Sequence, residues 1–162
     1  MHTFEQVIDE FGPALARIAA SYERNQALRE ELQQDIMFCV FQALPQLKDS
    51  AKIRPFVFRI AHNCCVDHVV KHAGLPATDG VHAELQSNEL TPEQQLLGNE
   101  RTLRLVEAIR RLDLPYRQVM TLLLEDMSYG DIAESLGISV TNVGVRVNRA
   151  KIQLKGLLHH DG

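Results

Sequence analysis

The C-terminal part of the chain contains a basic segment with the composition of a nucleic-acid-binding helix. Residues 138–160 include no Asp or Glu. The cations of this segment are Arg146, Arg149, Lys151 and Lys155. The whole chain has a net charge of −4, but salt screens charges beyond about 8–10 Å, so a local basic helix can still bind phosphates. The segment therefore predicts binding to nucleic acid.

The residues around this segment have the spacing of a helix-turn-helix. Ile132 and Leu136 lie four residues apart on one face, and Ala133 is small where a second helix must cross closely. Gly137 can adopt the left-handed conformation that ends a helix, and Ser139 can cap the next helix. In that next helix, core spacing is shown by Val143, Val147, Ala150 and Leu154. The face left outward fits the DNA major groove and consists of Asn142, Gly144, Val145, Asn148 and Arg149.

Helical periodicity dominates the rest of the chain, so we expect an all-α protein. Two small helical bundles, at residues 1–73 and 92–162, are expected on either side of a flexible acidic linker at 74–91. Expected helices begin at Thr3, which is followed by Gln6 in a capping box, and then span 26–44, 55–72, 92–112 and 115–124. Thr91 is expected to cap the fourth of these, and two short helices close the chain. We also expect residues 12–13, Gly-Pro, to kink or break the first helix.

The composition excludes several classes of protein. Hydrophobic residues make up 45% and charged residues 23% of the 162 residues, as in a folded globular chain. Apolar runs such as 122–124 are too short to span a bilayer, and the N-terminal residues lack a secretory leader, so we expect a cytoplasmic protein without membrane insertion. Cys39, Cys64 and Cys65 suit neither a disulfide framework nor a Cys-x-x-Cys metal site, and buried, reduced thiols are expected. No metal, cofactor or catalytic residue set is expected.

Three segments together resemble a known family. Residues 30–37 resemble the helix with which sigma factors bind the clamp helices of the polymerase beta-prime subunit. Residues 56–67 resemble the helix that engages the minus-ten promoter element, and residues 139–151 resemble the helix that reads the minus-thirty-five element. The order and spacing are those of extracytoplasmic-function sigma factors of the sigma-70 family. The resemblance implies that residues 1–73 form region 2 and residues 92–162 form region 4.

The resemblance also implies which residues bind which partner. The residues implied to bind polymerase are Glu31, Leu32, Gln34, Asp35 and Ile36. Contacts to the minus-ten element fall to Lys48, Lys52, Phe56, Arg59, His62, Asn63 and Lys71. Contacts to the minus-thirty-five element fall to Asn142, Gly144, Val145, Arg146, Asn148, Arg149 and Lys151. Asn63 matches a position at the pocket that receives a flipped base, and residues 47–52 should line that pocket. Phe58 is expected in the core, whereas Phe56 is expected both to pack and to stack.

The implied partners are promoter DNA and core RNA polymerase, bound at its beta-prime clamp helices and its beta flap. An anti-sigma factor is a further candidate. A helical hairpin with a solvated basic face would explain the C-terminal segment alone, and so would a regulator that recruits polymerase indirectly. Neither explains the acidic helix at 30–37 or the helix that ends near Asn63 and Asp67. An enzyme is disfavoured because no paired carboxylates, nucleophile triad or phosphate-binding glycine loop is found.

Overall fold

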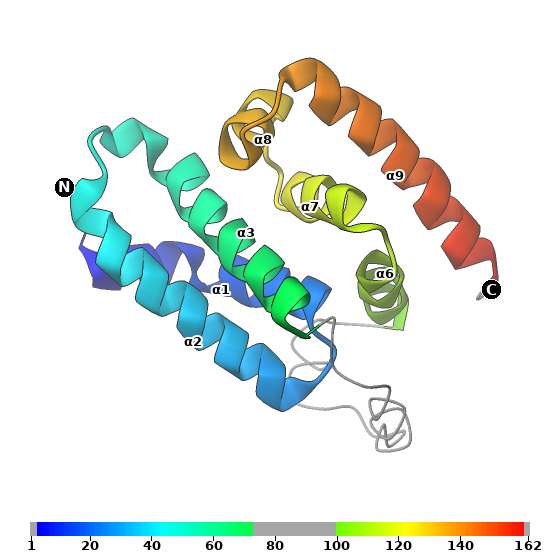
Figure 1. Cartoon of the computed structure of the whole chain (residues 1–162), viewed down its shortest axis with the longest axis horizontal. Helices are drawn as coiled ribbons and strands as arrows, with labels where there is room; N and C mark the ends of the chain where they lie inside the picture. Colours follow the sequence, from blue (N-terminus) through cyan, green and yellow to red (C-terminus); the bar gives the residue numbers. More distant parts are fainter. Residues whose placement is uncertain (1–2, 73–99, 161–162) are drawn as a thin grey trace.

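The computed structural model describes residues 3–72 and 100–160 (Figure 1). The elements of the first range are α1 (Phe4–Tyr22), α2 (Gln26–Ala43), the 3-10 turns η1 (Leu44–Gln46) and η2 (Ser50–Lys52), and α3 (Ile53–His72). Those of the second range are α6 (Glu100–Arg110), α7 (Leu114–Leu123), α8 (Tyr129–Leu136) and α9 (Val140–His160). Within these two ranges there is no strand, which confirms the all-α expectation. The expected linker at 74–91 and the expected cap at Thr91 lie outside the described residues.

The first three helices form the N-terminal bundle, and local signals in the sequence set their starts. Thr3 and Gln6 make the expected capping box, with the Gln6 amide donating to the Thr3 hydroxyl at 3.2 Å. Asn25 caps α2 by accepting from the Leu28 amide at 3.0 Å. Of the expected kink or break at residues 12–13, the break does not occur, because α1 continues through Pro13. Pro13 lies on the exposed side of α1, where water can replace the backbone hydrogen bond that proline cannot make.

The last four helices form the C-terminal bundle, and its helix-turn-helix has the expected signals. The Ser128 hydroxyl caps α8 by accepting from the Asp131 amide at 3.1 Å. Gly137 ends α8 with a φ of 70°, and the Ser139 hydroxyl caps α9 by accepting from the Asn142 amide at 3.1 Å. The four residues expected in the core of α9 are buried: Val143, Val147, Ala150 and Leu154. One expectation needs correction, since α9 is 21 residues long and not short.

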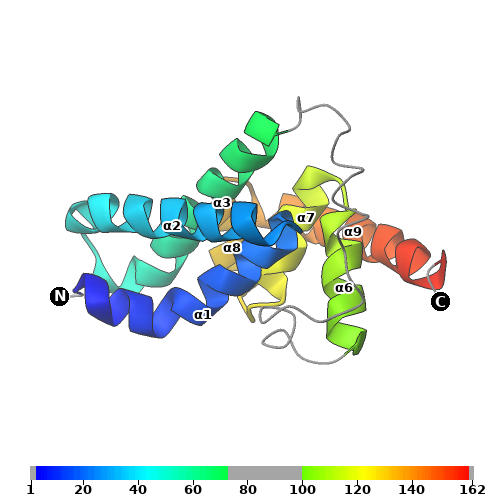
Figure 2. The same ribbon diagram turned by 90° about the horizontal axis from the view of Figure 1, so that it is seen from below.

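The two bundles pack directly against each other. In Figure 1, α1, α2 and α3 lie on one side and α6 to α9 on the other, with α3 beside α7 and α8. Turning the molecule, as in Figure 2, keeps α8 against the N-terminal bundle and α6 near the end of α1. Contacts join α3 to α8 and α1 to α6, and the buried apolar side chains of both bundles form one cluster. None of the described helices has the length and apolarity needed to cross a membrane.

Candidate polymerase and DNA interfaces

The exposed face of α2 carries the acidic and amide groups expected to meet a basic partner. Glu31, Gln34 and Asp35 are all exposed. Leu32 and Ile36 are only 1% and 0% exposed, which corrects the expectation that they contact polymerase. They belong to the apolar stripe of α2 that packs into the N-terminal bundle, so they hold the acidic face in place from inside.

Two exposed aromatic residues extend the surface of α2, and sequence reasoning did not assign them to it. Phe38 is 53% and Phe41 is 57% exposed. The Phe41 ring rests on Phe4 of α1 in an edge-on contact with 5.2 Å between ring centroids. Large exposed apolar side chains of this kind mark contact surfaces. Their distance from the apolar stripe could have been a signal in the sequence, since neither fits the spacing of Leu32 and Ile36.

A cavity of about 500 Å³ opens where the turns before α3 meet that helix. Its lining residues are Gln46, Leu47, Lys48, Asp49, Lys52, Pro55, Phe56, Arg59 and Glu134. The cavity therefore unites residues 47–49 and Lys52 with Phe56 and Arg59, whereas residues 50 and 51 of the expected loop do not line it. Phe58 is fully buried, which confirms its expected place in the core, and its ring makes an edge-on contact with Phe11.

The remaining residues assigned to the minus-ten element lie on different parts of α3. Asn63 is exposed one turn beyond Arg59, outside the lining of the cavity. Lys71 is exposed near the end of the helix, and the helical rise puts it about 12 Å beyond Asn63. The structure therefore groups Lys48, Lys52, Phe56 and Arg59, with Asn63 as their neighbour and Lys71 apart.

His62 is buried and does not face solvent, which corrects its assignment to DNA contact. Its Nδ1 lies 2.9 Å from the Tyr22 hydroxyl and its Nε2 lies 3.4 Å from the Thr121 hydroxyl. Burial lowers the pKa of His62 from 6.5 to about 3, so the imidazole is neutral. A helical wheel places His62 next to the core positions of α3, but the sequence could not reveal that Thr121 of α7 would cover it.

The residue that sequence reasoning missed in this region is Glu134 of α8. Its carboxylate lines the cavity, and it lies 3.3 Å from the Lys52 amine. Its backbone carbonyl accepts a hydrogen bond from the Arg59 guanidinium. No local signal links residues about 80 positions apart in the sequence, and only the packing of the two bundles brings them together.

The outward face of α9 forms the third surface. Asn142, Val145, Asn148 and Arg149 are exposed, and Lys151 continues the same exposed strip. Arg146 is half-buried, and so is Gly144, where an added Cβ would lie 3.8 Å from the Tyr129 ring. The structure thus presents the expected recognition residues on one helix, with Gly144 beside α8.

Comparison with known proteins identifies the family of the chain. The family description "Sigma-70 region 2" matches residues 7–74, and "Sigma-70, region 4" matches residues 102–154. RNA polymerase sigma factor NccH from Alcaligenes xylosoxydans xylosoxydans is 30% identical over 97% of this chain and 87% of its own. The chain belongs to the sigma-70 family. Region 2 contains the α2 face and all of the residues that line the cavity except Glu134, and region 4 contains Glu134 and the α9 face.

Other relatives of this sigma factor agree with the extracytoplasmic-function type. RNA polymerase sigma factor CnrH from Cupriavidus metallidurans is 29% identical over 98% of this chain and 87% of its own. The ECF RNA polymerase sigma factor SigM of Bacillus subtilis is 25% identical, with 96% and 94% covered.

Two solved sigma factor structures have the same fold as this chain. CnrH in complex with the cytosolic domain of CnrY matches 98% of this chain and 89% of its own, with a TM-score of 0.71 and 25% identity. RpoE in complex with the anti-sigma factor NepR, from Bartonella quintana, matches 98% of both chains, with a TM-score of 0.75 and 24% identity. Both structures therefore show the all-helical fold of a sigma factor.

The cysteines of this sigma factor are free thiols, as expected, but only Cys65 is buried, and Cys39 and Cys64 are half-buried. Burial raises the pKa of Cys64 to about 12, and it also raises the pKa of the more deeply buried Cys65. Thiols held in this protonated state are weak nucleophiles and weak metal ligands. Over residues 3–72 and 100–160, no three His, Cys, Asp or Glu side chains are placed to hold a metal ion.

Proposed function

We propose that this sigma factor docks on core RNA polymerase through α2 and reads promoter DNA with α3 and α9. As a sigma-70 family member it is a transcription initiation factor that directs RNA polymerase to promoters. The observation that supports this division is that all three surfaces are exposed on separate helices, in the order that the family uses. Glu31, Gln34 and Asp35 supply negative charge and amides to a basic partner surface, which favours fast and specific docking.

The α3 surface has the chemistry needed to capture an opened DNA strand. Lys48, Lys52 and Arg59 can hold phosphates, and the half-buried Phe56 ring can stack on a base, worth about 1–3 kcal/mol. Asn63 offers both a donor and an acceptor to the edge of a flipped base. No covalent bond changes in this process. The free energy for opening comes from capturing the unstacked base together with the polymerase.

The α9 surface separates base reading from phosphate binding. Arg149 is exposed and can present a bidentate fork to guanine, and Asn148 can reach a base edge. Arg146, Lys151 and Lys155 suit phosphates, which position a helix but carry no sequence information. Gly144 adds no side-chain contact, and it lies beside Tyr129 of α8.

An inhibitory partner is part of the proposal. The structural relative CnrH is seen in complex with the cytosolic domain of CnrY. We propose a protein of the anti-sigma kind as a partner of this chain.

Run-off transcription with core polymerase tests the proposed function. We expect transcripts from discrete start sites that appear only when the chain is added, and mapping those sites gives the promoter elements. Binding to core polymerase in the absence of DNA separates a sigma factor from a regulator that recruits polymerase indirectly. A chain that binds promoter DNA but neither binds core polymerase nor starts transcripts would contradict the proposal.

A further inference from the structure

Two of the three cysteines lie against each other between α2 and α3. Cys39 is on α2, Cys64 is on α3, and both side chains are half-buried. The Cys64 thiol makes a hydrogen bond with the Cys39 sulfur. The Cys64 sulfur also lies 4.0 Å from the backbone carbonyl oxygen of Asp35, one helical turn before Cys39. Because side chains on a helix lean toward its N-terminus, the Cys39 side chain extends over that same turn, where Cys64 meets it.

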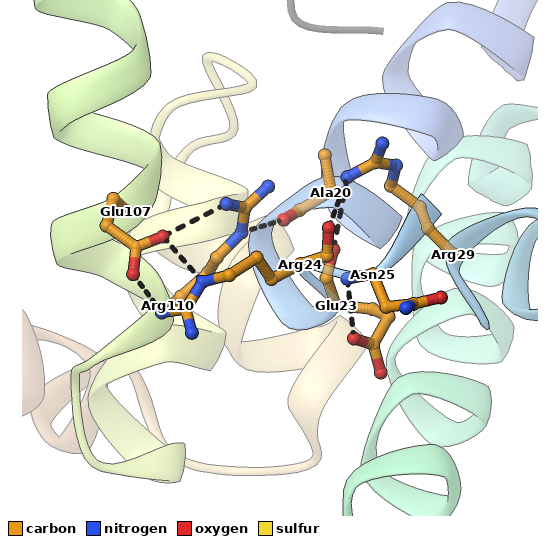
Figure 3. Close-up of polar contacts among 7 residues, drawn as sticks. All are labelled: Ala20, Glu23, Arg24, Asn25, Arg29, Glu107 and Arg110. Atoms are coloured by element: carbon orange, nitrogen blue, oxygen red, sulfur yellow. Dashed lines mark hydrogen bonds and ion pairs between the residues drawn. The ribbon is translucent and has the colours of Figure 1, made fainter. Parts of the chain in front are cut away.

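Contacts at the start of α2 fix the position of this helix on α3. Figure 3 shows the Glu23 carboxylate, which accepts from the Asn25 backbone amide at 2.9 Å, and Arg29, which donates to the Glu23 carbonyl. The other carboxylate oxygen of Glu23 lies 2.7 Å from Nε2 of His68, one turn beyond Cys64 on α3. The two helices also contact each other directly. The fold therefore holds the two sulfurs in contact, which a disulfide between them requires.

The two thiols differ in how they can react. Burial and the hydrogen bond to Cys39 raise the pKa of Cys64 to about 12, so the Cys64 thiol stays protonated and is the donor of that bond. The Cys39 sulfur is the acceptor, and the thiolate is the form of cysteine that attacks an oxidant. Cys39 is therefore the nucleophile of the pair, and Cys64 is the neighbouring thiol that reacts with the oxidised product.

We propose that Cys39 and Cys64 are a redox pair that a peroxide converts to a disulfide, which fastens α2 to α3 and weakens transcription initiation. The Cys39 thiolate attacks one oxygen of hydrogen peroxide, the O–O bond breaks, and Cys39 becomes a sulfenic acid while the other oxygen leaves as hydroxide. The Cys64 sulfur then attacks the Cys39 sulfur, the S–O bond breaks, and the departing hydroxide takes the Cys64 proton. The two thiols lose two electrons, and the peroxide is reduced to two molecules of water.

The disulfide acts on both proposed surfaces of region 2. Asp35 of the α2 face lies one turn before Cys39, and Asn63 of the α3 surface immediately precedes Cys64. The bond brings the sulfurs to about 2.0 Å, well inside any hydrogen-bond length, so the two helices must shift against each other. The effect on transcription rests on the proposed function of α2 and α3, whereas formation of the disulfide does not.

Cys65 cannot replace either member of the pair. Neighbouring side chains on a helix point about 100° apart, so Cys65 faces the core while Cys64 faces α2. Cys65 is 0% exposed, and burial raises the pKa of its thiol, which keeps it protonated and out of reach of the oxidant. Cys65 is therefore an internal reference that should remain a free thiol after oxidation.

Thiol counting and mass spectrometry test the disulfide without polymerase. After the folded chain is treated with hydrogen peroxide and then denatured, we expect a maleimide to label one thiol instead of three. The intact mass should fall by two hydrogen atoms, and peptide mapping should place the cross-link between Cys39 and Cys64. Dithiothreitol should restore all three thiols.

Two matched variants separate the roles of the pair, and circular dichroism checks that both are folded. Cys39→Ser lacks the nucleophile and should keep both of its remaining thiols. Cys64→Ser lacks the second thiol, so Cys39 should stop at the sulfenic acid, which dimedone traps. The treated wild-type chain should give no dimedone adduct at Cys39 once its disulfide has formed.

Run-off transcription measures the consequence of the disulfide. The chain is oxidised and freed of peroxide before core polymerase is added, which leaves the thiols of polymerase untouched. We expect the oxidised wild-type chain to lose most of its transcripts and to regain them with dithiothreitol. Cys39→Ser should give the same transcripts before and after the treatment.

The outcomes separate the redox pair from the proposed function. Three unreacted thiols in the treated wild-type chain overturn the pair, and so does a cross-link that uses Cys65 or joins two chains. A Cys39–Cys64 disulfide that leaves transcription unchanged overturns the proposed effect on initiation. Absence of transcripts from the reduced, untreated chain would instead overturn the proposed function, and the thiol count would still decide whether the pair forms.

Discussion

Among single residues, Asn63 has the clearest separable role, because it is exposed beside the cavity and its amide both donates and accepts. A residue that captures a flipped base should act on DNA opening and not on the first encounter with duplex DNA.

Asn63→Ala should therefore slow open-complex formation by about tenfold or more, since losing a good base contact costs about 1–3 kcal/mol. Permanganate reactivity of thymines in the minus-ten element measures opening, and a gel shift with duplex promoter measures recruitment. We expect recruitment to change little. An equal loss of both, or of neither, would show that Asn63 does not meet a flipped base.

The buried imidazole of His62 should make the free energy of unfolding depend on pH. The unfolded chain takes up a proton on this residue below pH 6.5, whereas burial keeps its folded pKa at about 3. The folded state therefore has its full stability above pH 6.5 and loses it as the pH falls toward 3. Between pH 7 and pH 5 this one group should cost about 2 kcal/mol.

Urea unfolding of the wild-type chain and of His62→Gln at both pH values measures that cost. The amide can keep a polar contact to Tyr22 and Thr121 but does not titrate, so its free energy of unfolding should fall less between pH 7 and pH 5. His159→Gln, at an exposed position near the end of α9, serves as the control and should keep the wild-type dependence. Identical pH dependence in all three chains would mean that His62 titrates freely.

At the scale of the helices, α2 packs into the core with one face and is proposed to bind polymerase with the other. The stripe of α2 that contains Leu32 and Ile36 faces inward, which leaves Glu31, Gln34 and Asp35 outward on a rigid support. A change confined to the outward side should alter docking and leave the fold intact.

Asp35→Lys should reverse the local charge complementarity and weaken binding to core polymerase by about 2 kcal/mol or more. Titration of labelled core enzyme measures the affinity. Asp9→Lys makes the same charge change at an exposed position on α1 and should have little effect. A folded Asp35→Lys protein that binds core enzyme normally would remove α2 from the polymerase interface.

The outward face of α9 should divide into base-reading and phosphate-binding residues. Arg149→Ala is expected to relax preference at one position of the minus-thirty-five element, where a bidentate contact is worth about 1–3 kcal/mol. Lys155→Ala should weaken all promoters alike and lower the salt dependence by about one unit of slope. Competition binding with a library of upstream elements at two salt concentrations tests both. A uniform loss in Arg149→Ala would contradict base reading by this face.

The sequence predicted the helices well because their determinants are local. The capping box at Thr3, the left-handed Gly137 and the core spacing of Val143 and Val147 each act within a few residues. Pro13 does not break α1, because it lies on the exposed side of the helix, where water can bond the carbonyl that the proline leaves without a donor. The same periodicity that located α2 could not by itself tell an apolar docking residue from a core residue at Leu32.

At the scale of the whole molecule, the sequence did not predict how the two regions pack against each other. His62 was assigned to DNA, and Glu134 was assigned to nothing, because their neighbours Thr121 and Lys52 lie far away in the chain. Contacts of this kind depend on the packing of the bundles and leave no periodic signal. The packing of α8 against α3 nevertheless brings Glu134 beside Lys52 and Arg59.

The contacts between the two regions should contribute measurably to the stability of the whole chain. Arg17 binds Glu125 through two hydrogen bonds, and the Glu125 side chain is only 10% exposed. Removing the arginine leaves that carboxylate without its cation in a mostly buried position. We expect Arg17→Ala to cost about 1 kcal/mol and to lower Tm by about 2–4 °C.

Differential scanning calorimetry measures this shift, with Arg104→Ala as the matched control. Arg104 pairs with Glu100 inside α6, at 3.7 Å and largely in solvent, so its loss should change Tm by less than the loss of Arg17. High salt should narrow the difference in Tm between the two variants, because it screens the remaining charges between the two regions. If both variants melted together at low salt, region 2 and region 4 would not be joined through Arg17 in solution, and the stability of each region would be its own.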